Sequence, residues 1–285
     1  MRIVNFSADG ASEFNSGNWR GLIPGRAINK LPGHSYTLLS VRSWLDARPE
    51  STRIMNLADT IIIQRVAVAE TIKYVKEWRS KGKTVIGDFD DSYDKIDNSN
   101  QAHAFWAEGL VEVQLSNNIK YKKKLENHPI EMLKDFIRLS NSGTTPGKWL
   151  VDDWKQYGNM RFLPNYIDSE RYLSVPPFKK KDDKIVIGYG GSMSHVASFM
   201  ESGVNEALAR VIRKRNNVMV LICGDKRVWD NLPVPNHKKA HQNYMRSVWW
   251  GKALRQFDIG LAPLARFYDH RRSAIKSEEY SLMVI

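Results

Sequence analysis

Residues 185–195, IVIGYGGSMSH, decide the fold of this chain. The segment runs from β-branched apolar residues into glycines and a serine, and a helical pattern follows over Val196–Arg215. This order predicts a buried strand, a tight turn and a helix. Because backbone N–H groups at a helix start attract anions, the turn within Ile187–His195 could hold a phosphate. An ordinary strand-to-helix turn would explain the same glycines, so both interpretations stay open here.

The same alternation of short apolar runs and longer amphipathic stretches extends in both directions from this segment. It is typical of parallel sheets covered by helices, so we expect an α/β fold of two doubly wound, Rossmann-like domains. The first series has predicted strands Arg2–Phe6, Tyr36–Val41, Thr60–Ile63, Thr84–Ile86 and Phe136–Leu139, with helices Ala67–Lys81 and Lys148–Tyr157. The second series has the helix Val196–Arg215, the strand Val218–Gly224, the helix Gln242–Gln256 and the strand Asp258–Leu264.

Residues 164–184, PNYIDSERYLSVPPFKKKDDK, separate the two series. They are rich in Pro, Lys and Asp and follow neither the helical nor the strand period, which is typical of a linker. We therefore expect a first domain over 1–165, a linker over 166–183 and a second domain over 184–285.

The C-terminal side of the second domain is short. After Asp258–Leu264 the sequence offers one more helical pattern, Ser273–Leu282. About a hundred residues remain for a domain that usually needs about 150, so we expect an incomplete second sheet. Apolar residues there (Leu282, Val284 and Ile285) would favour self-association through an open edge.

Composition narrows the class of protein. The chain has 285 residues, a net charge of +12 and 42% hydrophobic residues. No apolar run approaches the roughly 18 residues that span a bilayer and no signal segment is evident, so we expect a cytoplasmic protein. Cys223 is the single cysteine, which excludes an internal disulfide, and its apolar surroundings predict a buried side chain.

The positive charge is unevenly distributed. Residues 1–178 carry 24 basic and 21 acidic side chains, whereas residues 179–285 carry 19 and 10. The second half should therefore bind an anion, and nucleotides, phosphosugars, nucleic acid and anionic membranes all remain open. The run KYKKK at Lys120–Lys124 is predicted to be the solvated face of a helix, with a binding patch as the alternative.

A second signal for a site lies in residues 257–280, FDIGLAPLARFYDHRRSAIKSEEY. A strand is followed by a basic stretch, and then by a helix that carries Lys276 and Glu279 three residues apart on one face. A cation beside a carboxylate suits a sugar nucleotide, since the cation can neutralise a diphosphate and the carboxylate can bind ribose hydroxyls. A surface ion pair would explain the same spacing.

Together these segments resemble the family 4 glycosyltransferases of GT-B architecture, in which two Rossmann-like domains face each other, with the donor in the second and the acceptor in the first. The resemblance covers most of the chain. It rests on the loop with Gly190, Gly191, Ser192 and His195, the strand DIGLAPL, the helix with Ser273, Lys276 and Glu279, and the segments LPNYID (163–168), RGLIPGRAI (20–28), IIIQR (61–65), GDFDDS (87–92) and NSGTTPGKWL (141–150).

The resemblance implies retaining transfer of a sugar from a nucleotide-diphosphate donor, with no resident cofactor and no metal. Lys276, Glu279 and Asp91 would be the catalytic residues, with Lys276 stabilising leaving-group charge and Glu279 binding ribose. The implied donor site comprises Gly190, Gly191, Ser192, His195, Arg272, Ser273, Lys276 and Glu279. The implied acceptor side comprises Gly21, Arg65, Asp88 and Asp90. Many family members carry a second glutamate eight positions before the ribose-binding one, where this chain has Arg271, so the sugar is not assigned.

Two further groups of residues could bind metals. Asp88, Asp90, Asp91 and Asp94 could hold a hard cation, bind acceptor hydroxyls, supply a base, or simply cap a loop with Asp91 or Ser92. His237 and His241 share an i,i+4 spacing but lack a third ligand, so no zinc site is predicted.

The leading hypothesis is therefore a nucleotide-sugar-dependent glycosyltransferase, with a glycan, lipid, protein or modified DNA as the acceptor. The alternative is a nucleic-acid-binding or inactive interaction protein that keeps the GT-B fold. Because residues 1–178 are nearly neutral, the charge distribution favours the enzyme over the nucleic-acid binder.

Overall fold

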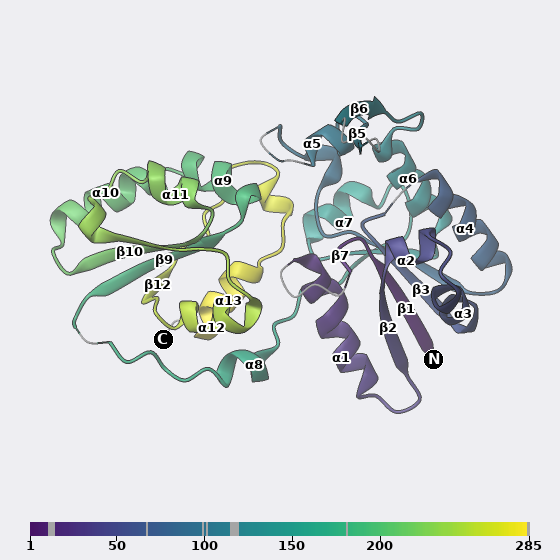
Figure 1. Ribbon diagram of the computed structural model, residues 1–285, viewed down its shortest axis with the longest axis horizontal. Coiled ribbons are helices and arrows are strands. Elements are labelled where there is room, and N and C mark those ends of the chain that lie inside the picture. The colour runs from purple at the N-terminus through teal and green to yellow at the C-terminus, as the bar shows by residue number, and fades with distance from the viewer. Residues whose placement is uncertain are drawn as a thin grey trace. The chain divides into compact units, whose positions relative to one another are not determined.

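The computed structural model describes residues 1–10, 15–66, 68–98, 100, 102–114, 120–180 and 182–283. The chain forms two compact units (Figure 1). Unit 1 consists of Met1–Tyr166 together with Arg271–Ser273, and unit 2 consists of Ile167–His270 together with Ala274–Ile285. Within the described residues, none of the helices has the length and apolar character needed to cross a membrane.

Unit 1 is built on a six-stranded parallel sheet in the order β2-β1-β3-β4-β7-β8. Its strands are β1 (Arg2–Ser7), β2 (Ser35–Ser40), β3 (Thr60–Gln64), β4 (Thr84–Asp88), β7 (Ser142–Thr145) and β8 (Met160–Phe162). The register places Ser7 beside Gln64, Gln64 beside Asp88 and Asp88 beside Thr144. Polar residues that are distant in sequence therefore meet at the carboxyl edge of the sheet.

The two faces of β1 bury different types of side chain. Phe6 packs on Trp44, with ring centroids 5.3 Å apart, and Trp44 packs in turn on Trp78 at 5.1 Å. These rings come from helices α2 (Val41–Leu45) and α4 (Ala69–Ser80). Asn5 alternates with Phe6 along the strand, and its side-chain amide donates to the Tyr36 hydroxyl at 2.6 Å. One face of the sheet is thus aromatic and the other contains polar side chains that need partners.

The remaining elements of unit 1 connect these strands. They are the π-helical turn η1 (Asn18–Leu22), α1 (Ile23–Asn29), α3 (Pro49–Leu57), the 3-10 turn η2 (Tyr93–Lys95), α5 (His103–Trp106), α6 (Pro129–Leu139), α7 (Lys148–Trp154) and a separate antiparallel hairpin of β5 (Leu110–Gln114) and β6 (Lys120–Lys124). Gly25 of α1 lies against the Tyr36 ring, where a Cβ atom would come within 2.6 Å of a ring carbon. Glycine at this position lets the helix approach the sheet closely.

Two predictions for unit 1 were wrong. Phe136–Leu139 ends helix α6 and is not a strand, because Leu133, Phe136 and Ile137 are buried at helical spacing. Lys120–Lys124 is a strand and not part of a helix, although every residue is exposed, which confirms the predicted solvated face. The strand prediction also missed β7, whose sequence SGTT has no apolar residue. Helix α4 begins at Ala69, and Ala67, where its start was predicted, lies outside the described residues.

Unit 2 has a four-stranded parallel sheet in the order β11-β10-β9-β12. Its strands are β9 (Ile185–Gly191), β10 (Val218–Gly224), β11 (Lys239–Gln242) and β12 (Ile259–Gly260). Its helical elements are α8 (Ser169–Leu173), η3 (Met193–His195), α9 (Val196–Glu201), α10 (Val204–Lys214), α11 (Lys226–Asn231), η4 (Asn236–Lys238), α12 (Ser247–Leu254) and α13 (Ile275–Met283). Cys223 is buried in β10 as predicted.

Glycines of β9 make room for aromatic rings on one face of this sheet. A Cβ atom on Gly188 would lie 2.1 Å from the Phe257 ring, and one on Gly190 would lie 2.2 Å from the Trp250 ring. On the other face Tyr189 packs on Phe199 of α9, with centroids 4.4 Å apart. Close packing therefore explains two of the glycines that the sequence offered as a phosphate loop.

Several predicted boundaries in unit 2 differ from the structure. The predicted helix Val196–Arg215 is broken at Gly203, whose φ of +76° suits glycine. The predicted helix Gln242–Gln256 starts only at Ser247, after β11. The predicted linker is not irregular throughout, because it contains α8, which groups with unit 2. Of the three residues predicted to form an open edge, Leu282 is half-buried, and Val284 and Ile285 lie outside the described residues.

Candidate functional site

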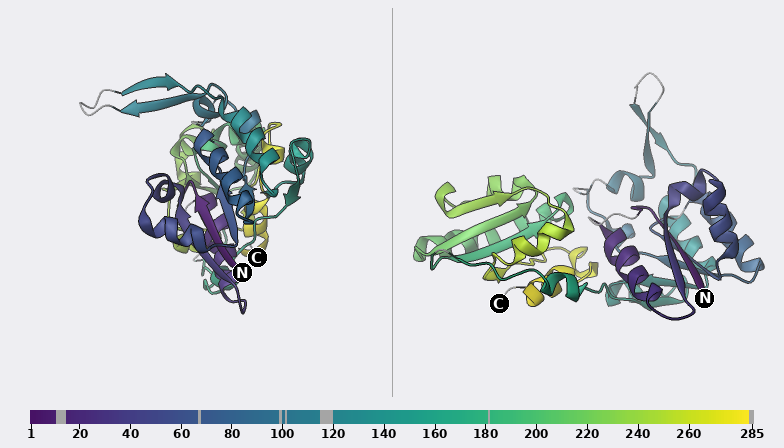
Figure 2. Two further views of the ribbon diagram at one scale, coloured as in Figure 1. Left: turned by 90° about the vertical axis from the view of Figure 1, so that its right-hand side faces the viewer. Right: turned by 60° about the horizontal axis from the view of Figure 1, so that its bottom comes forward.

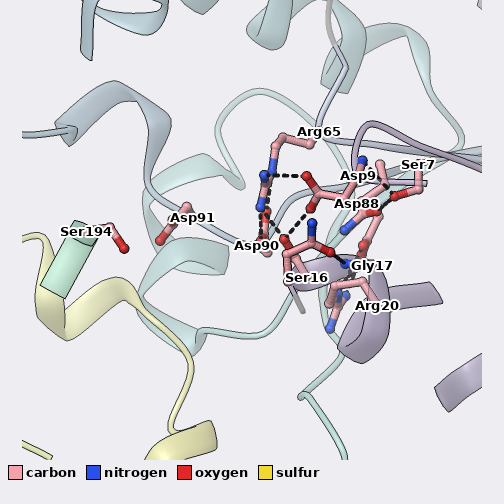
Figure 3. Close-up of polar contacts among 12 residues, drawn as sticks. Ser7, Asp9, Ser16, Gly17, Arg20, Arg65, Asp88, Asp90, Asp91 and Ser194 are labelled. Carbon is pink, nitrogen blue, oxygen red and sulfur yellow. Dashed lines mark hydrogen bonds and ion pairs between the residues drawn. The ribbon is translucent and has the colours of Figure 1, made fainter. Parts of the chain in front are cut away.

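The carboxyl edge of the unit 1 sheet holds a buried ion pair between Arg20 of η1 and Asp88 at the end of β4 (Figure 3). The guanidinium Nε donates to the two carboxylate oxygens of Asp88 at 3.2 and 3.0 Å. The hydroxyl of Thr144, on the neighbouring strand β7, donates to Asp88 Oδ1 at 2.6 Å. Ligands of parallel sheets commonly bind at this edge, but the oxygens of Asp88 are already occupied by protein donors.

Arg20 extends this contact to the segment after β8. Its Nη1 donates to the Leu163 carbonyl and to Asn165 Oδ1, the latter at 3.2 Å. Burial lowers the pKa of Arg20, but the charge and hydrogen bonds of Asp88, together with the charges of Asp90 and Tyr93, outweigh burial, so the pKa is raised. Arg20 is therefore a fixed cation that joins η1, β4 and the end of unit 1.

Arg65 makes a second ion-pair network beside the first. It follows β3 with a φ of +61°, a left-handed conformation uncommon for a residue with a side chain. Its backbone N–H donates to the Asp88 carbonyl at 2.9 Å. Its guanidinium donates to both oxygens of Asp90, at 3.1 and 2.7 Å, and to Asp9 at 3.2 Å (Figure 3). These bonds hold the strained backbone in place.

Asp90 is consequently a permanent anion. Burial raises its pKa, but the charge and hydrogen bonds of Arg65, together with hydrogen bonds from Ser16 and Tyr93, outweigh burial, so the net pKa lies well below the ordinary value. The Tyr93 hydroxyl also donates to Asp90. Like Asp88, this carboxylate serves the protein's own donors.

The structure brings together three of the four residues predicted for the acceptor side, Arg65, Asp88 and Asp90. The fourth, Gly21, lies in η1, where a Cβ atom would come within 3.0 Å of Leu38. Asp91 is less enclosed: its side chain is 24% exposed, and its Oδ1 lies 3.8 Å from the Nε of Arg272. Of these carboxylates, Asp91 is the better placed to meet a ligand.

The aspartate cluster does not form a metal site within the described part of the chain. No group of three or more His, Cys, Asp and Glu side chains there is arranged to hold a metal ion. Asp94 accepts from the Ser92 hydroxyl at 3.0 Å and lies 3.5 Å from Lys95. His241 lies on β11 and His237 in η4, so this pair does not share a helix.

In unit 2 the central group is Glu279 of α13, which is 4% exposed. The Tyr172 hydroxyl, from α8, donates to Glu279 Oε1 at 2.5 Å, and Trp250 makes a further hydrogen bond to the carboxylate. Burial raises the pKa of Glu279 to about 7, against the lowering effect of these two donors and of Lys276. The Glu279 carboxyl therefore changes charge near neutral pH, unlike Asp90.

Lys276 lies one turn before Glu279 and contacts His195. Its Nζ is 2.9 Å from His195 Nε2 and 3.0 Å from Nδ1. Which ring nitrogen takes part in the hydrogen bond depends on the tautomer of the imidazole. The structure thus joins His195, from the turn after β9, to the predicted donor helix.

Some polar groups of the glycine turn at the end of β9 already form hydrogen bonds within the protein. The Gly190 N–H donates to the Tyr280 hydroxyl at 3.1 Å, and the Gly191 carbonyl accepts from Asp225 N at 3.0 Å. Ser192 Oγ lies 3.0 Å from Ser194 Oγ. The Gly190 amide is therefore bound to a protein hydroxyl, whereas Ser192 is exposed.

Arg272 and Ser273 were predicted to bind the donor, but the structure groups them with unit 1. There Arg271 is buried and pairs with Asp153 of α7, with Nη2 at 3.2 Å from Oδ1. A donor-binding role for Arg272 and Ser273 therefore stays a prediction.

Sequence reasoning missed several residues of these networks. Arg20 was quoted only as part of a motif, and Asp9 and Ser16 were not considered. Tyr172 lay in the predicted linker, and Tyr280 and Trp250 were not predicted as site residues. Tyr172 and Glu279 are 107 positions apart, and Tyr280 and Gly190 are 90 apart, so no local spacing signals such contacts.

Comparison with solved structures identifies the type of fold. Neither a family model nor a curated protein matches this sequence. The lipopolysaccharide outer core galactosyltransferase WaaB, in its apo form, is 11% identical, with a TM-score of 0.53 over 98% of this chain and 78% of that one. A UDP-forming α,α-trehalose-phosphate synthase from Burkholderia xenovorans is 9% identical, with a TM-score of 0.54 over 100% of this chain and 81% of that one.

A third similar structure is the catalytic domain of starch synthase IV from Arabidopsis thaliana, bound to ADP and acarbose. It is 8% identical, with a TM-score of 0.50 over 91% of this chain and 76% of that one. At these identities the likeness shows the fold alone. The fold is of the GT-B type with two Rossmann-like units, which confirms the predicted fold class, while membership of family 4 stays a prediction.

We expect Asp88→Asn to lower the free energy of unfolding by about 3–5 kcal/mol, because it leaves the buried Arg20 guanidinium without its counter-charge. Urea denaturation measures the change. The control Asp94→Asn, at a more exposed aspartate of the same loop region, should stay within about 1 kcal/mol of the wild type. Equal effects of the two variants would contradict the assigned role of the Arg20–Asp88 pair.

We expect Glu279 to make stability depend on pH. Its pKa is raised from 4.5 to about 7 by folding, so the folded state binds an extra proton between these values. The free energy of unfolding of the wild type should therefore fall by about 3 kcal/mol, relative to that of Glu279→Gln, as the pH rises from 4.5 to about 7. It should fall no further above that pH. Unfolding free energies across this range test it. Glu206→Gln, on the exposed side of α10, should parallel the wild type, and a parallel profile for Glu279→Gln would refute the shift.

Proposed function

We propose that this chain is a nucleotide-sugar-dependent glycosyltransferase whose donor binds to unit 2. The observation that carries the proposal is the placement of Lys276 and Glu279 on one helix, with Glu279 buried and held by neutral donors. A desolvated carboxylate without a paired guanidinium retains a strong tendency to accept further hydrogen bonds. The two hydroxyls of a ribose are suitable donors.

The diphosphate of the donor would meet Lys276, the Gly191 amide and the Ser192 hydroxyl. Lys276 contributes a positive charge, and His195 fixes its position at 2.9 Å. The family resemblance also assigns Gly190, Arg272 and Ser273 to the donor, but the Gly190 amide would first have to leave the Tyr280 hydroxyl. We therefore assign the main diphosphate contacts to Lys276 and Ser192.

The proposed reaction breaks the bond between the anomeric carbon and the diphosphate oxygen and forms a bond to the oxygen of an acceptor hydroxyl, whose proton passes to the departing diphosphate. Negative charge builds on the departing diphosphate, so a cation placed there beforehand lowers the barrier by several kcal/mol. In unit 1 we propose Asp91 as the carboxylate that meets the acceptor, because its side chain is 24% exposed, against 4% for Asp88 and 11% for Asp90. Retention at the anomeric carbon and independence from metal ions are part of this proposal.

A ligand panel tests the proposed function. Nucleoside diphosphates and their sugars should raise the melting temperature of the wild type, because binding to the native state alone stabilises it. Titration calorimetry at pH 8 should then show that Lys276→Ala and Glu279→Gln each weaken binding at least tenfold, since each loses a charge-assisted contact. Binding and sugar transfer should persist in EDTA.

Matched controls separate the site from general charge effects. Lys214→Ala and Glu206→Gln change the same residue types on exposed positions of α10 in the same unit. Both should bind the nucleotide as the wild type does. Unchanged affinity in Lys276→Ala and Glu279→Gln, with both variants folded, would remove the donor-site assignment, and activity that needs added Mg²⁺ would refute metal independence.

A further inference from the structure

The hairpin of β5 and β6 is separate from the main sheet of unit 1. Its strands pair antiparallel, with Val113 opposite Tyr121, Glu112 opposite Lys122 and Val111 opposite Lys123. Both views of Figure 2 show the ribbon projecting from the rest of unit 1. An isolated two-stranded ribbon is only marginally stable in water, so a projecting one gains from a partner.

The hairpin concentrates the charge of the first half of the chain. Its two strands carry four lysines against one glutamate, a surplus of +3. Residues 1–178 have the same surplus of +3 in total, with 24 basic and 21 acidic side chains. The rest of this half is therefore balanced, and its near neutrality does not argue against a polyanionic partner.

Most of this charge is not neutralised within the protein. Every residue of β6 is exposed. Lys120 pairs with Glu112 at 2.8 Å, but no described residue forms an ion pair or hydrogen bond with the side-chain ammonium groups of Lys122, Lys123 or Lys124. Three adjacent ammonium groups repel one another, and an anion placed among them relieves that repulsion.

The cations lie on both faces of the ribbon. Side chains alternate along a strand, so Lys122 and Lys124 point to one face and Tyr121 and Lys123 to the other. A flat anionic surface can contact only one of these faces. A groove with phosphates along both walls can contact both, and the major groove of B-form DNA is wide enough for a two-stranded ribbon.

We propose that the β5–β6 hairpin is a docking arm for a nucleic-acid duplex. Lys122, Lys123 and Lys124 contact backbone phosphates, and the Tyr121 ring, which is 45% exposed, packs against the sugar and base edges. Such contacts position a duplex without selecting its sequence. The proposal does not depend on sugar transfer, and if both proposals hold, the duplex is the class of macromolecule brought to the enzyme.

Fluorescence anisotropy with a labelled 20-base-pair DNA duplex, at several salt concentrations, tests the proposal. The triple variant Lys122→Gln/Lys123→Gln/Lys124→Gln should bind at least tenfold more weakly. It should also reduce the slope of log affinity against log salt by about 2–3, because each phosphate contact contributes about 0.9. Replacing the same three lysines with arginine should preserve binding.

The control variant Lys30→Gln/Lys73→Gln/Lys76→Gln removes the same charge from exposed positions elsewhere in unit 1. It should bind the duplex within twofold of the wild type with an unchanged salt slope. As a second measurement on the unaltered protein, the duplex should protect Lys122, Lys123 and Lys124 from acetylation, read by mass spectrometry, and leave Lys73 and Lys76 reactive.

Three results would overturn the proposal. The first is an absence of duplex binding by the wild type or of protection at the hairpin. The second is an equal loss in the control variant, which would show a bulk charge effect. The third is hairpin-dependent binding of phosphatidylserine vesicles without binding of DNA, which would make the partner a membrane. None of these measurements uses the nucleotide sugar, so failure here leaves the donor-site test unaffected.

Discussion

The buried pair of Arg20 and Asp88 is the contact on which the arrangement of unit 1 depends. A charge removed from water needs a partner, and here one guanidinium and one carboxylate satisfy each other with several bonds. Around them, Thr144 fixes β7 to the end of β4, and Asn165 fixes the segment after β8 to η1. Four parts of the chain meet at this one pair, at the edge where parallel sheets usually bind ligands.

The two units solve the problem of buried charge differently. In unit 1 each central carboxylate faces a guanidinium, so Asp90 stays ionised, with a pKa well below the ordinary value. In unit 2 Glu279 is held by the hydroxyl of Tyr172 and by Trp250, and burial raises its pKa to about 7. In the unit 1 arrangement the carboxylate oxygens already accept hydrogen bonds from arginines, so these ion pairs form a rigid frame. The second leaves a carboxyl group that gains from additional donors, which is why we assign the nucleotide to unit 2.

The sequence predicts the α/β class because the alternation of apolar runs and amphipathic stretches is a local property, and the resemblance of its motifs to a glycosyltransferase family implies the GT-B fold. The strand at 185–191 and the helix carrying Lys276 and Glu279 were found in this way. Local patterns gave the wrong secondary structure where the residues of a segment suit a helix and a strand equally well. Phe136–Leu139 is apolar enough for a strand but completes the buried face of α6, and KYKKK fits a solvated helix as well as an exposed strand.

The site was predictable only in part. The position of Lys276 and Glu279 one turn apart on one helix followed from their spacing in the sequence. The hydrogen bond from Tyr172 to Glu279 did not, because it joins residues 107 positions apart. Similarly, Arg20 of η1 and Asp88 of β4 form a buried ion pair although they are 68 positions apart, and no motif records that contact. The glycines of β9 show the limit most clearly: they suggested a phosphate loop, but Gly188 and Gly190 also make room for Phe257 and Trp250.

A crystal structure of the protein with a bound nucleoside diphosphate tests the central claim most directly. The account predicts density on unit 2, with the ribose hydroxyls donating to the Glu279 carboxylate and the diphosphate beside Lys276 and Ser192. A nucleotide bound away from α13, or one bound there whose ribose does not contact Glu279, would contradict it.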